Sequence, residues 1–309
     1  MKIYHYDKFY KFYTHSENIV DRIEGQGLPA SSTEIPPPLD QCQEDEIPIF
    51  SDGEWLIVED RFWRPQIVEV NYDAGRSISD FHFEDLSYMD FPVYPEMPQL
   101  CNTQLVVQKI IQSIRVVNKK FLKSLSLLKK CHDRDDIQIL DSPKRNDLVL
   151  SPTTLYEYKC EVESLVFIMR RIIDSLVQLT DLLVNFDAFV EKKKLYFESI
   201  GSTFASKNSD QLVTKIIMGG DQYERDETNF LPVINQLFNA FKHTLMHDET
   251  TTWMREDGPT ILCLSVKYSD YKKEITYHNH NAYHIMMGFQ DCIKRILANQ
   301  KKYIALQQI

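Results

Sequence analysis

Apolar residues recur at spacings of three and four along the middle of the chain, which is the period of a helix with one buried face. The run has ten members: Leu155, Tyr158, Val162, Leu165, Met169, Ile172, Leu176, Leu179, Leu183 and Phe186. Ser151 and Pro152 precede it as a typical N-cap and first helical residue. The pattern predicts one long helix over about residues 152–186. Its wide apolar stripe favours the central helix of a bundle, with a dimeric coiled coil as the alternative.

Helical periodicity also occurs on both sides of this segment. Further helices are predicted over about residues 101–130, 187–200, 208–218, 227–247 and 281–305. In the last of these, the inward residues are Ile285, Phe289, Ile293, Ile296 and Leu297. Gly219 and Gly220 indicate a helix stop. Alternating residues around Ser269 and Asp270 predict a β-hairpin over about 260–278, before the final helix.

The beginning of the chain has a different pattern. Asp52-Gly53 separates two short apolar segments, and this dipeptide is a strong signal for a tight hairpin turn. Pro36, Pro37 and Pro38 precede the hairpin and predict an extended spacer. A hairpin alone is marginally stable in water, so we expect Trp55 and Trp63 to pack on the helical body or on another protein. The module is either a structural element folded onto its own chain or a docking surface.

These patterns predict a mainly α protein that is α+β overall. Residues 1–70 form a small β module in this interpretation, and residues 101–309 form a helical bundle with an inserted β-hairpin. Residues 71–100 are rich in aromatic residues and proline, with Pro92, Pro95 and Pro98 three residues apart. That spacing is typical of an extended strap that lies on a surface.

Composition narrows the range of functions. Among 309 residues there are only 9 Gly, and neither a dinucleotide-binding loop nor a phosphate-binding P-loop motif occurs. The six Cys are scattered without a zinc or disulfide pattern. No apolar run approaches the length of a membrane span, and no signal peptide precedes the first module. The sequence therefore predicts a cytoplasmic protein without membrane association.

The net charge of −10 argues against general nucleic-acid binding by the whole chain. Basic residues nevertheless cluster at two places. They are Lys119, Lys120, Lys123, Lys129 and Lys130 in one segment, and Lys192, Lys193 and Lys194 in another. Either cluster can hold a polyanion locally, although a solvated helix face is the commoner explanation.

The segment 227–247 carries the best candidate site. Asn235, Asn239, His243 and His247 are four residues apart, on a helix face nearly opposite the apolar residues. Amide and imidazole groups donate and accept hydrogen bonds, and histidine also transfers protons near neutral pH. Lys242 lies beside this file and adds a positive charge for a phosphate. The alternative is a polar packing or dimer contact.

A second candidate is a metal site at His278, His280 and His284. The first two would lie on one side of a strand, and the third about one helical turn further on. His243 and His247 could join them, although no Glu completes an HExxH motif, since Asp248 and Glu249 only follow the second histidine. Such loose histidine groups are usually ordinary surface residues, so neither a metal nor another cofactor is expected.

The first 65 residues resemble a known kind of module. The stretches MKIYHYD, LPASSTEIPPPLDQ and EIPIFSDGEWLIVED, followed by RFWRP, are similar to the N-terminal segment of bacteriophage tail-fibre and tail-fibre-assembly proteins. The resemblance implies an origin on phages or prophages. It also implies that this segment recognises a phage tail protein or its chaperone.

The helix predicted over 227–247 resembles the motif helix of HEPN domains. These are small helical bundles, often dimeric, and many are metal-independent ribonucleases with an Arg, a polar residue and a His. His243 corresponds to that histidine and Asn239 to the polar neighbour. The chain departs from the motif because no Arg lies four to six residues before His243, and position 238 is Phe. Cations from elsewhere that would substitute in space are Arg170, Arg171 or Arg255.

Two functional hypotheses follow from these resemblances. In the first, a tail-like recognition module is fused to a HEPN-like domain that cuts RNA as a homodimeric toxin in anti-phage defence. Its expected catalytic residues are His243, Asn239, Lys242 and His247. In the second, the chain is a non-enzymatic tail-fibre assembly chaperone or adaptor. The second needs only binding, and it fits the acidic charge and the missing arginine.

Overall fold

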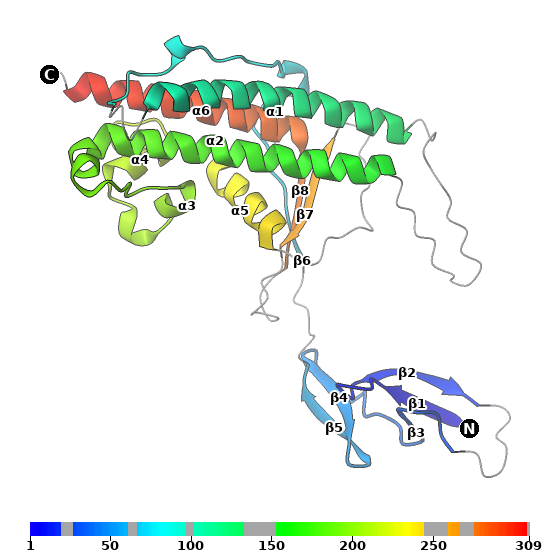
Figure 1. The fold of residues 1–309 in the computed structure, drawn as a ribbon. Helices are drawn as coiled ribbons and strands as arrows, with labels where there is room; N and C mark the ends of the chain where they lie inside the picture. The colour runs from blue at the N-terminus through cyan, green and yellow to red at the C-terminus, as the bar shows by residue number, and fades with distance from the viewer. Residues whose placement is uncertain are drawn as a thin grey trace. The chain divides into compact units, whose positions relative to one another are not determined.

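The computed structural model describes residues 1–19, 27–60, 67–96, 102–132, 153–243, 259–265 and 275–307. These residues belong to two compact units that divide after Ile67. The N-terminal unit comprises Met1–Ile67 and Lys267–Ile275, and the helical unit comprises Val68–Val266 and Thr276–Ile309. The fold is mainly α, and α+β when both units are considered (Figure 1).

The N-terminal unit contains two small antiparallel sheets. Its strands are β1 (Lys2–Tyr6), β2 (Tyr13–Asn18), β3 (Ser32–Thr33), β4 (Glu46–Ser51) and β5 (Glu54–Glu59). The first sheet has the order β2-β1-β3, and the second is the hairpin β4-β5. In that hairpin Asp52 and Gly53 both have positive φ, 53° and 90°, as a type I′ turn requires. The predicted hairpin is confirmed, whereas the three-stranded sheet was not anticipated.

Aromatic residues form the core of this unit. Trp55 contacts Phe50, Tyr6 and Tyr13 edge-on, with ring centroids 5.1–6.3 Å apart. Its indole nitrogen donates a hydrogen bond of 2.7 Å to the carbonyl of Ile35. Trp55 thus packs within its own unit, while Trp63 lies outside the described residues. Edge-to-face aromatic pairs of this kind add to the burial energy of a small core.

Long helices dominate the second unit. The helices are α1 (Thr103–His132), α2 (Thr153–Lys192), α3 (Ile200–Thr203), α4 (Leu212–Met218), α5 (Phe230–His243) and α6 (Ala282–Gln307). Short 3-10 helices are η1 (Ile78–Asp80), η2 (Tyr88–Asp90) and η3 (Ser206–Asn208). Figure 1 shows α1, α2 and α6 running side by side, with α4 and α5 packed against α2 and α6. One continuous apolar core joins them.

The long helix predicted over 152–186 is confirmed and extends to Lys192, with non-helical backbone at Asn185. The separate helix predicted over 187–200 is wrong. Asp181 on α2 explains the difference, because its carboxylate accepts the backbone N–H groups of Tyr196 at 2.8 Å and Phe197 at 3.3 Å. The chain after Lys192 therefore turns back along α2 and does not start another helix.

The predicted helix stop is confirmed at Gly219, which ends α4 with φ 87°. A Cβ atom at this position would collide with the backbone of Glu224 and Arg225. Only glycine fits both the conformation and the space. The inward face predicted for the last helix is confirmed too, since all five of its residues are buried in α6.

The predicted hairpin before α6 exists as β7 (Thr260–Ser265) and β8 (Ile275–Asn281). A third strand, β6 (Ile67–Val70), joins it in the order β6-β8-β7. The side-chain amide of Asn279 donates to Glu69 at 2.8 Å across these strands. The sequence missed β6 because a four-residue strand has too few positions to show an alternating pattern. The turn predicted at Ser269 and Asp270 lies outside the described residues.

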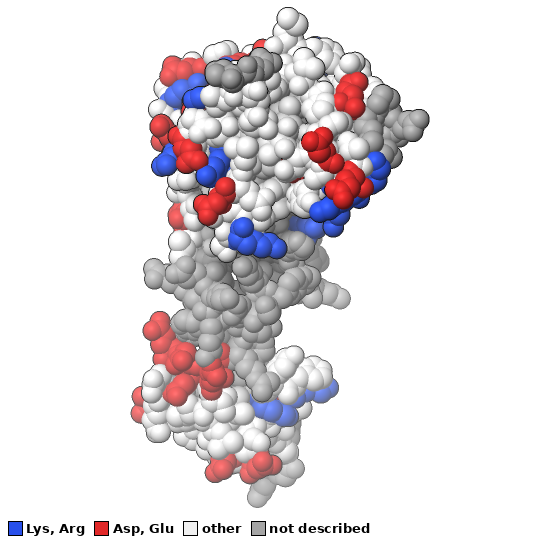
Figure 2. All heavy atoms as spheres, turned by 90° about the vertical axis from the view of Figure 1, so that its left-hand side faces the viewer, with Lys and Arg blue, Asp and Glu red and all other residues white. Residues whose placement is uncertain are grey.

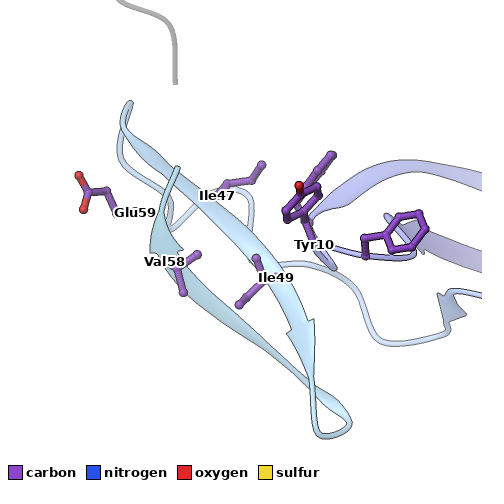
Figure 3. Close-up of a pocket in the computed structure, with 7 residues that line it drawn as sticks. Tyr10, Ile47, Ile49, Val58 and Glu59 are labelled. Atoms are coloured by element: carbon purple, nitrogen blue, oxygen red, sulfur yellow. The ribbon is translucent and has the colours of Figure 1, made fainter. Parts of the chain in front are cut away.

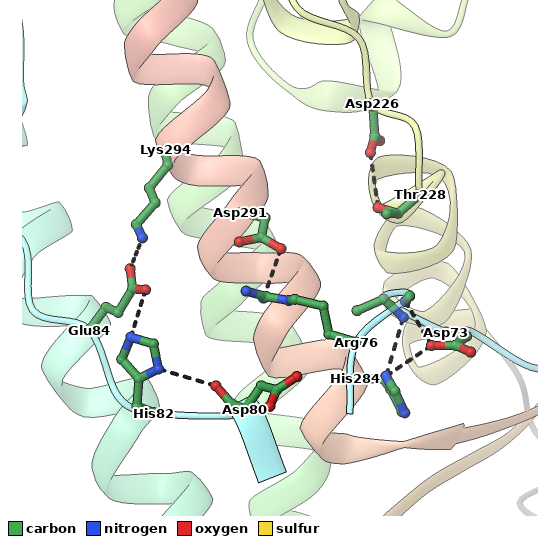
Figure 4. A network of polar contacts seen from close by, with 12 residues as sticks. Asp73, Arg76, Asp80, His82, Glu84, Asp226, Thr228, His284, Asp291 and Lys294 are labelled. Carbon is green, nitrogen blue, oxygen red and sulfur yellow. Dashed lines mark hydrogen bonds and ion pairs between the residues drawn. The ribbon is translucent and has the colours of Figure 1, made fainter. Parts of the chain in front are cut away.

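Residues 71–96 run in extended form along the helical unit, mostly over α6 (Figure 1). Figure 4 shows the polar contacts of this strap, which include the Arg76–Asp291 ion pair at 2.8 Å. Further along, the Tyr94 hydroxyl donates to Gln300 at 2.6 Å. Gly288 on α6 permits the close approach, because a Cβ there would collide with the ring of Tyr72. No helix among the described residues is long and apolar enough to cross a membrane.

A candidate site on helix α5

Helix α5 begins at a carboxylate cap. Asp226 accepts hydrogen bonds from the backbone N–H of Leu231 at 3.1 Å and of Phe230 at 3.4 Å. A carboxylate at this position accepts hydrogen bonds from free N–H groups. Its negative charge also interacts favourably with the positive end of the helix dipole. The buried face of the helix comprises Phe230, Leu231, Ile234, Leu237 and Ala240. These contacts fix how the opposite face of α5 is presented.

The polar residues predicted on α5 differ in their exposure to solvent. Asn239 and Lys242 are exposed, whereas Asn235 is half-buried. His243 is the last residue of the helix, and its side chain lies outside the described atoms. His247 lies outside the described residues altogether. The structure therefore places two of the four predicted catalytic side chains on the solvent-facing side of α5.

Asn235 is half-buried because Arg170 of α2 reaches it. The Arg170 guanidinium donates to the side-chain oxygen of Asn235 from Nε at 3.3 Å and from a terminal nitrogen at 3.2 Å. The same guanidinium lies over the Phe238 ring, 5.3 Å from its centroid. Phe238 in turn contacts Phe167 of α2 edge-on, with centroids 4.9 Å apart. The Arg170 guanidinium thus lies next to Phe238, which occupies one of the positions where the resemblance to the HEPN motif would require an arginine.

The charge of Arg170 is held inside the protein. The residue is 4% exposed, and it pairs with Asp174 one turn along α2. Burial lowers the pKa of Arg170 to about 10, so the group stays protonated at neutral pH. Asp174 also accepts the backbone N–H of Ile200 at 2.8 Å. Arg170 therefore contacts Asn235 and Phe238 from the buried side of α5 and does not itself face solvent.

The exposed part of the site contains an amide and an ammonium group. The Lys242 nitrogen lies 5.9 Å from the Phe238 ring centroid, so two cations, Arg170 and Lys242, lie near this ring. Asn239 and Lys242 are three residues apart and are neighbours on the helix surface. An amide and an ammonium group can bind a phosphate oxygen. Of the other arginines considered, Arg171 is exposed and Arg255 lies outside the described residues.

The three histidines considered as metal ligands do not come together. His278 and His280 are 1% and 0% exposed on β8, and their ring nitrogens lie 3.1 Å apart. His284 on α6 instead contacts Asp73 and the backbone N–H of Ala74, both at 3.2 Å (Figure 4). Among the described residues, no group of three or more His, Cys, Asp or Glu could hold a metal ion. The expectation that these histidines are surface residues is wrong for His278 and His280, because β8 turns both toward the core.

The N-terminal unit has a pocket of about 430 Å³ between the β4-β5 hairpin and the loop that joins β1 to β2. Its lining residues are Phe9, Tyr10, Phe12, Ile47, Ile49, Val58 and Glu59. Figure 3 shows Tyr10 across from Ile47 and Ile49 of β4. Asp7 holds the loop that carries the aromatic residues by accepting the backbone N–H groups of Phe9 at 2.8 Å and Tyr10 at 2.7 Å. Phe9 is 79% exposed, so the loop held by Asp7 presents a large apolar side chain to solvent.

Acidic residues gather on the N-terminal unit (Figure 2). Glu46 and Glu59 face each other across the β4-β5 hairpin, and Asp45 and Asp60 continue the two strands. These carboxylates make one end of the hairpin acidic. On the face of the helical unit drawn in Figure 2, acidic and basic side chains are interspersed.

Sequence reasoning missed the support that α2 gives to the site. Arg170 and Asp174 are four residues apart, which is the spacing of an ion pair on one helix face. This spacing was the one feature of the sequence that could have indicated the pair. It could not reveal that the guanidinium reaches α5. The pocket beside Phe9 and Tyr10 left no signal beyond the aromatic composition of the N-terminal unit. Comparison with known proteins found no matching family model, no matching curated protein and no matching solved structure.

Proposed function

We propose that this protein is a phage- or prophage-linked effector of anti-phage defence. The N-terminal unit recognises a phage tail protein or its chaperone, and the helical unit cleaves RNA as a HEPN-like, metal-independent nuclease in the cytoplasm. The proposed catalytic residues are Asn239, Lys242, His243 and His247. The observation that carries the proposal is that Asn239 and Lys242 are both exposed on α5. Phe238, which contacts the buried Arg170, lies beside them on the same helix.

The chemistry follows from the residue types. A histidine side chain can take a proton from a ribose hydroxyl and return one to a leaving oxygen. Lys242 would neutralise charge that develops on the phosphate, and Asn239 would orient it. Arg170 acts only through Asn235 and Phe238, so it is a positioning residue in this scheme. Two copies of the α5 face would form the complete site in a homodimer.

The alternative is a tail-fibre assembly chaperone or adaptor without catalysis. The N-terminal pocket and the exposed Phe9 favour binding by this unit. Both functions require that binding, so only the α5 face distinguishes them. An adaptor would tolerate changes at Asn239 and His243, whereas a nuclease would not.

The test is induced expression in bacteria of the wild type, His243→Ala and Asn239→Ala, with growth and total RNA integrity followed together. We expect growth arrest and RNA fragments for the wild type, and at least a hundredfold slower cleavage for His243→Ala, as for loss of a general base. The matched control is Gln307→Ala, which removes an exposed amide from the C-terminal end of α6.

Intact RNA and normal growth with the wild type, in cells with and without infecting phage, would reject the nuclease and favour the adaptor. RNA cleavage that persists in Asn239→Ala and His243→Ala would show that the activity lies elsewhere. Loss of cleavage in Gln307→Ala as well would indicate a general loss of folded protein and not a defect of the site. Purified protein with a chelating agent added tests independence from metal.

A further inference from the structure

Helix α1 differs in charge from the rest of the chain. Its 30 residues, Thr103–His132, include no Asp or Glu. Its basic residues are Lys109, Arg115, Lys119, Lys120, Lys123, Lys129 and Lys130. The whole chain has a net charge of −10, so this positive charge is a local feature and not a consequence of composition.

Only part of this charge is neutralised by neighbours. Lys120 and Lys123 both pair with Glu161 of α2, at 2.9 Å and 2.6 Å. The other five cations are exposed, and none of them forms an ion pair with a residue that the structure describes. They are Lys109, Arg115, Lys119, Lys129 and Lys130. The positive face of α1 is therefore not explained by packing against the helical unit.

The exposed residues form a stripe along the helix. Its members follow one another at intervals of three or four residues: Gln108, Gln112, Arg115, Lys119, Lys123, Ser126 and Lys130. All are exposed and lie opposite the buried residues Ile110, Ile114 and Phe121. At 1.5 Å per residue, Arg115, Lys119 and Lys123 follow each other at about 6 Å, and the stripe from Arg115 to Lys130 is about 22 Å long.

Regularly spaced cations and amides fit a polyanion with a regular charge repeat. Lysine and arginine neutralise phosphates, and glutamine donates hydrogen bonds to them. Helix α1 itself contributes no carboxylate that would repel such a ligand, and Glu161 of α2 is neutralised by Lys120 and Lys123. A lipid surface fits less well, because helices that lie in a membrane insert an apolar face. The apolar face of α1 is occupied by the core, where Val117 and Phe121 are both 0% exposed.

We propose that this α1 stripe binds the sugar–phosphate backbone of RNA. The choice of RNA among polyanions rests on the proposed function, while the positive stripe itself does not. The contacts are to phosphates, so binding is independent of base sequence and weakens steeply with salt. The stripe would hold the strand, and chemistry would take place elsewhere on the helical unit.

The experiment measures binding of a labelled single-stranded oligoribonucleotide by fluorescence anisotropy at several salt concentrations. The full chain carries His243→Ala so that cleavage does not interfere. Arg115→Gln with Lys119→Gln removes two central cations of the stripe. The matched control is Lys207→Gln with Arg225→Gln, which removes the same charge from exposed residues outside α1. Thermal unfolding followed by circular dichroism verifies that each variant is folded.

We expect the stripe variant to bind at least tenfold more weakly at low salt, with a log–log salt slope shallower by about 1.4, because each phosphate contact contributes about 0.7 for a single strand. The control should bind like its parent. Equal affinity and equal slope for the stripe variant and its parent would overturn the proposal. Stripe-dependent binding to phosphatidylserine vesicles without binding to RNA would overturn it in favour of a lipid surface.

The same measurements separate this inference from the proposed function. Stripe-dependent RNA binding by a chain that leaves cellular RNA intact would support the stripe and reject the nuclease. RNA cleavage by the wild type, combined with binding that does not depend on Arg115 and Lys119, would support the nuclease and reject the stripe.

Discussion

At the scale of residues, the most unusual groups are two buried histidines on β8. His278 and His280 contact each other at 3.1 Å, and the second ring nitrogen of His280 has no hydrogen-bond partner among the residues that the structure describes. Burial lowers the pKa of His278 to about 4 and that of His280 to about 3, from an ordinary value of 6.5. Both are therefore neutral in the folded protein at physiological pH.

This arrangement predicts a loss of stability in acid. Because the folded-state pKa values lie below the unfolded value, the unfolded chain binds more protons as pH falls below about 6.5. The free energy of unfolding should be unaffected above that pH and decrease toward pH 4, by at most about 1.4 kcal/mol per pH unit for each histidine. Urea unfolding between pH 7.5 and 4.5 measures the slope.

His280→Gln should reduce that slope, since one titrating group is removed. His82→Gln is the matched control, because the His82 side chain is 71% exposed. Equal slopes for the wild type and His280→Gln would contradict the account.

At the scale of elements, one buried ion pair connects α2 to α5 and α3. Arg170 contacts Asn235 and Phe238 of α5, and Asp174 accepts a hydrogen bond from Ile200 at the start of α3. Removing one partner of a buried pair leaves the other charge without compensation, which costs more than the pair itself contributes. The pair therefore holds three helices in place, although its net energy is modest.

Asp174→Ala should lower the free energy of unfolding by about 3–5 kcal/mol, because it leaves the Arg170 charge buried. Arg171→Ala, on the exposed side of the same helix, should change it by less than about 0.5 kcal/mol. Chemical denaturation followed by circular dichroism measures both. A change of under 1 kcal/mol in Asp174→Ala would mean that the Arg170 charge reaches water.

At the scale of the whole molecule, the two units have cores of very different kinds. The N-terminal unit relies on Ile3 and a few aromatic residues, whereas the helical unit has one continuous core along α1, α2 and α6. A small unit buries a smaller fraction of its surface and is less stable. Independent units of unequal stability do not unfold in one step.

We therefore expect two transitions in urea, with the N-terminal unit unfolding first. Ile3→Ala should shift only the first transition and Ile173→Ala only the second, each by about 2–5 kcal/mol, because both residues are fully buried. Fluorescence and circular dichroism, compared on one sample, resolve the transitions. A single transition that both variants shift equally would show that the units unfold together.

The sequence alone determined most of the local structure. Periodic apolar residues located α1, α2 and α6, and Asp52-Gly53 located a hairpin, because helix faces and tight turns depend on neighbouring residues. The helix predicted over 187–200 failed where Asp181 supplied a competing hydrogen-bond partner from a distance. The local pattern thus predicts secondary structure well, except where a side chain from another segment forms hydrogen bonds with the backbone.

The tertiary structure decided what the candidate site consists of. It separated Asn235, which Arg170 binds, from the exposed Asn239 and Lys242, although all three lie on one predicted helix. It buried His278 and His280, which the sequence placed at the surface, and it left Arg115, Lys119 and Lys130 of the α1 stripe without an ion pair to any residue that the structure describes. Burial and ion pairing depend on which elements pack together, and those contacts join residues far apart in the chain.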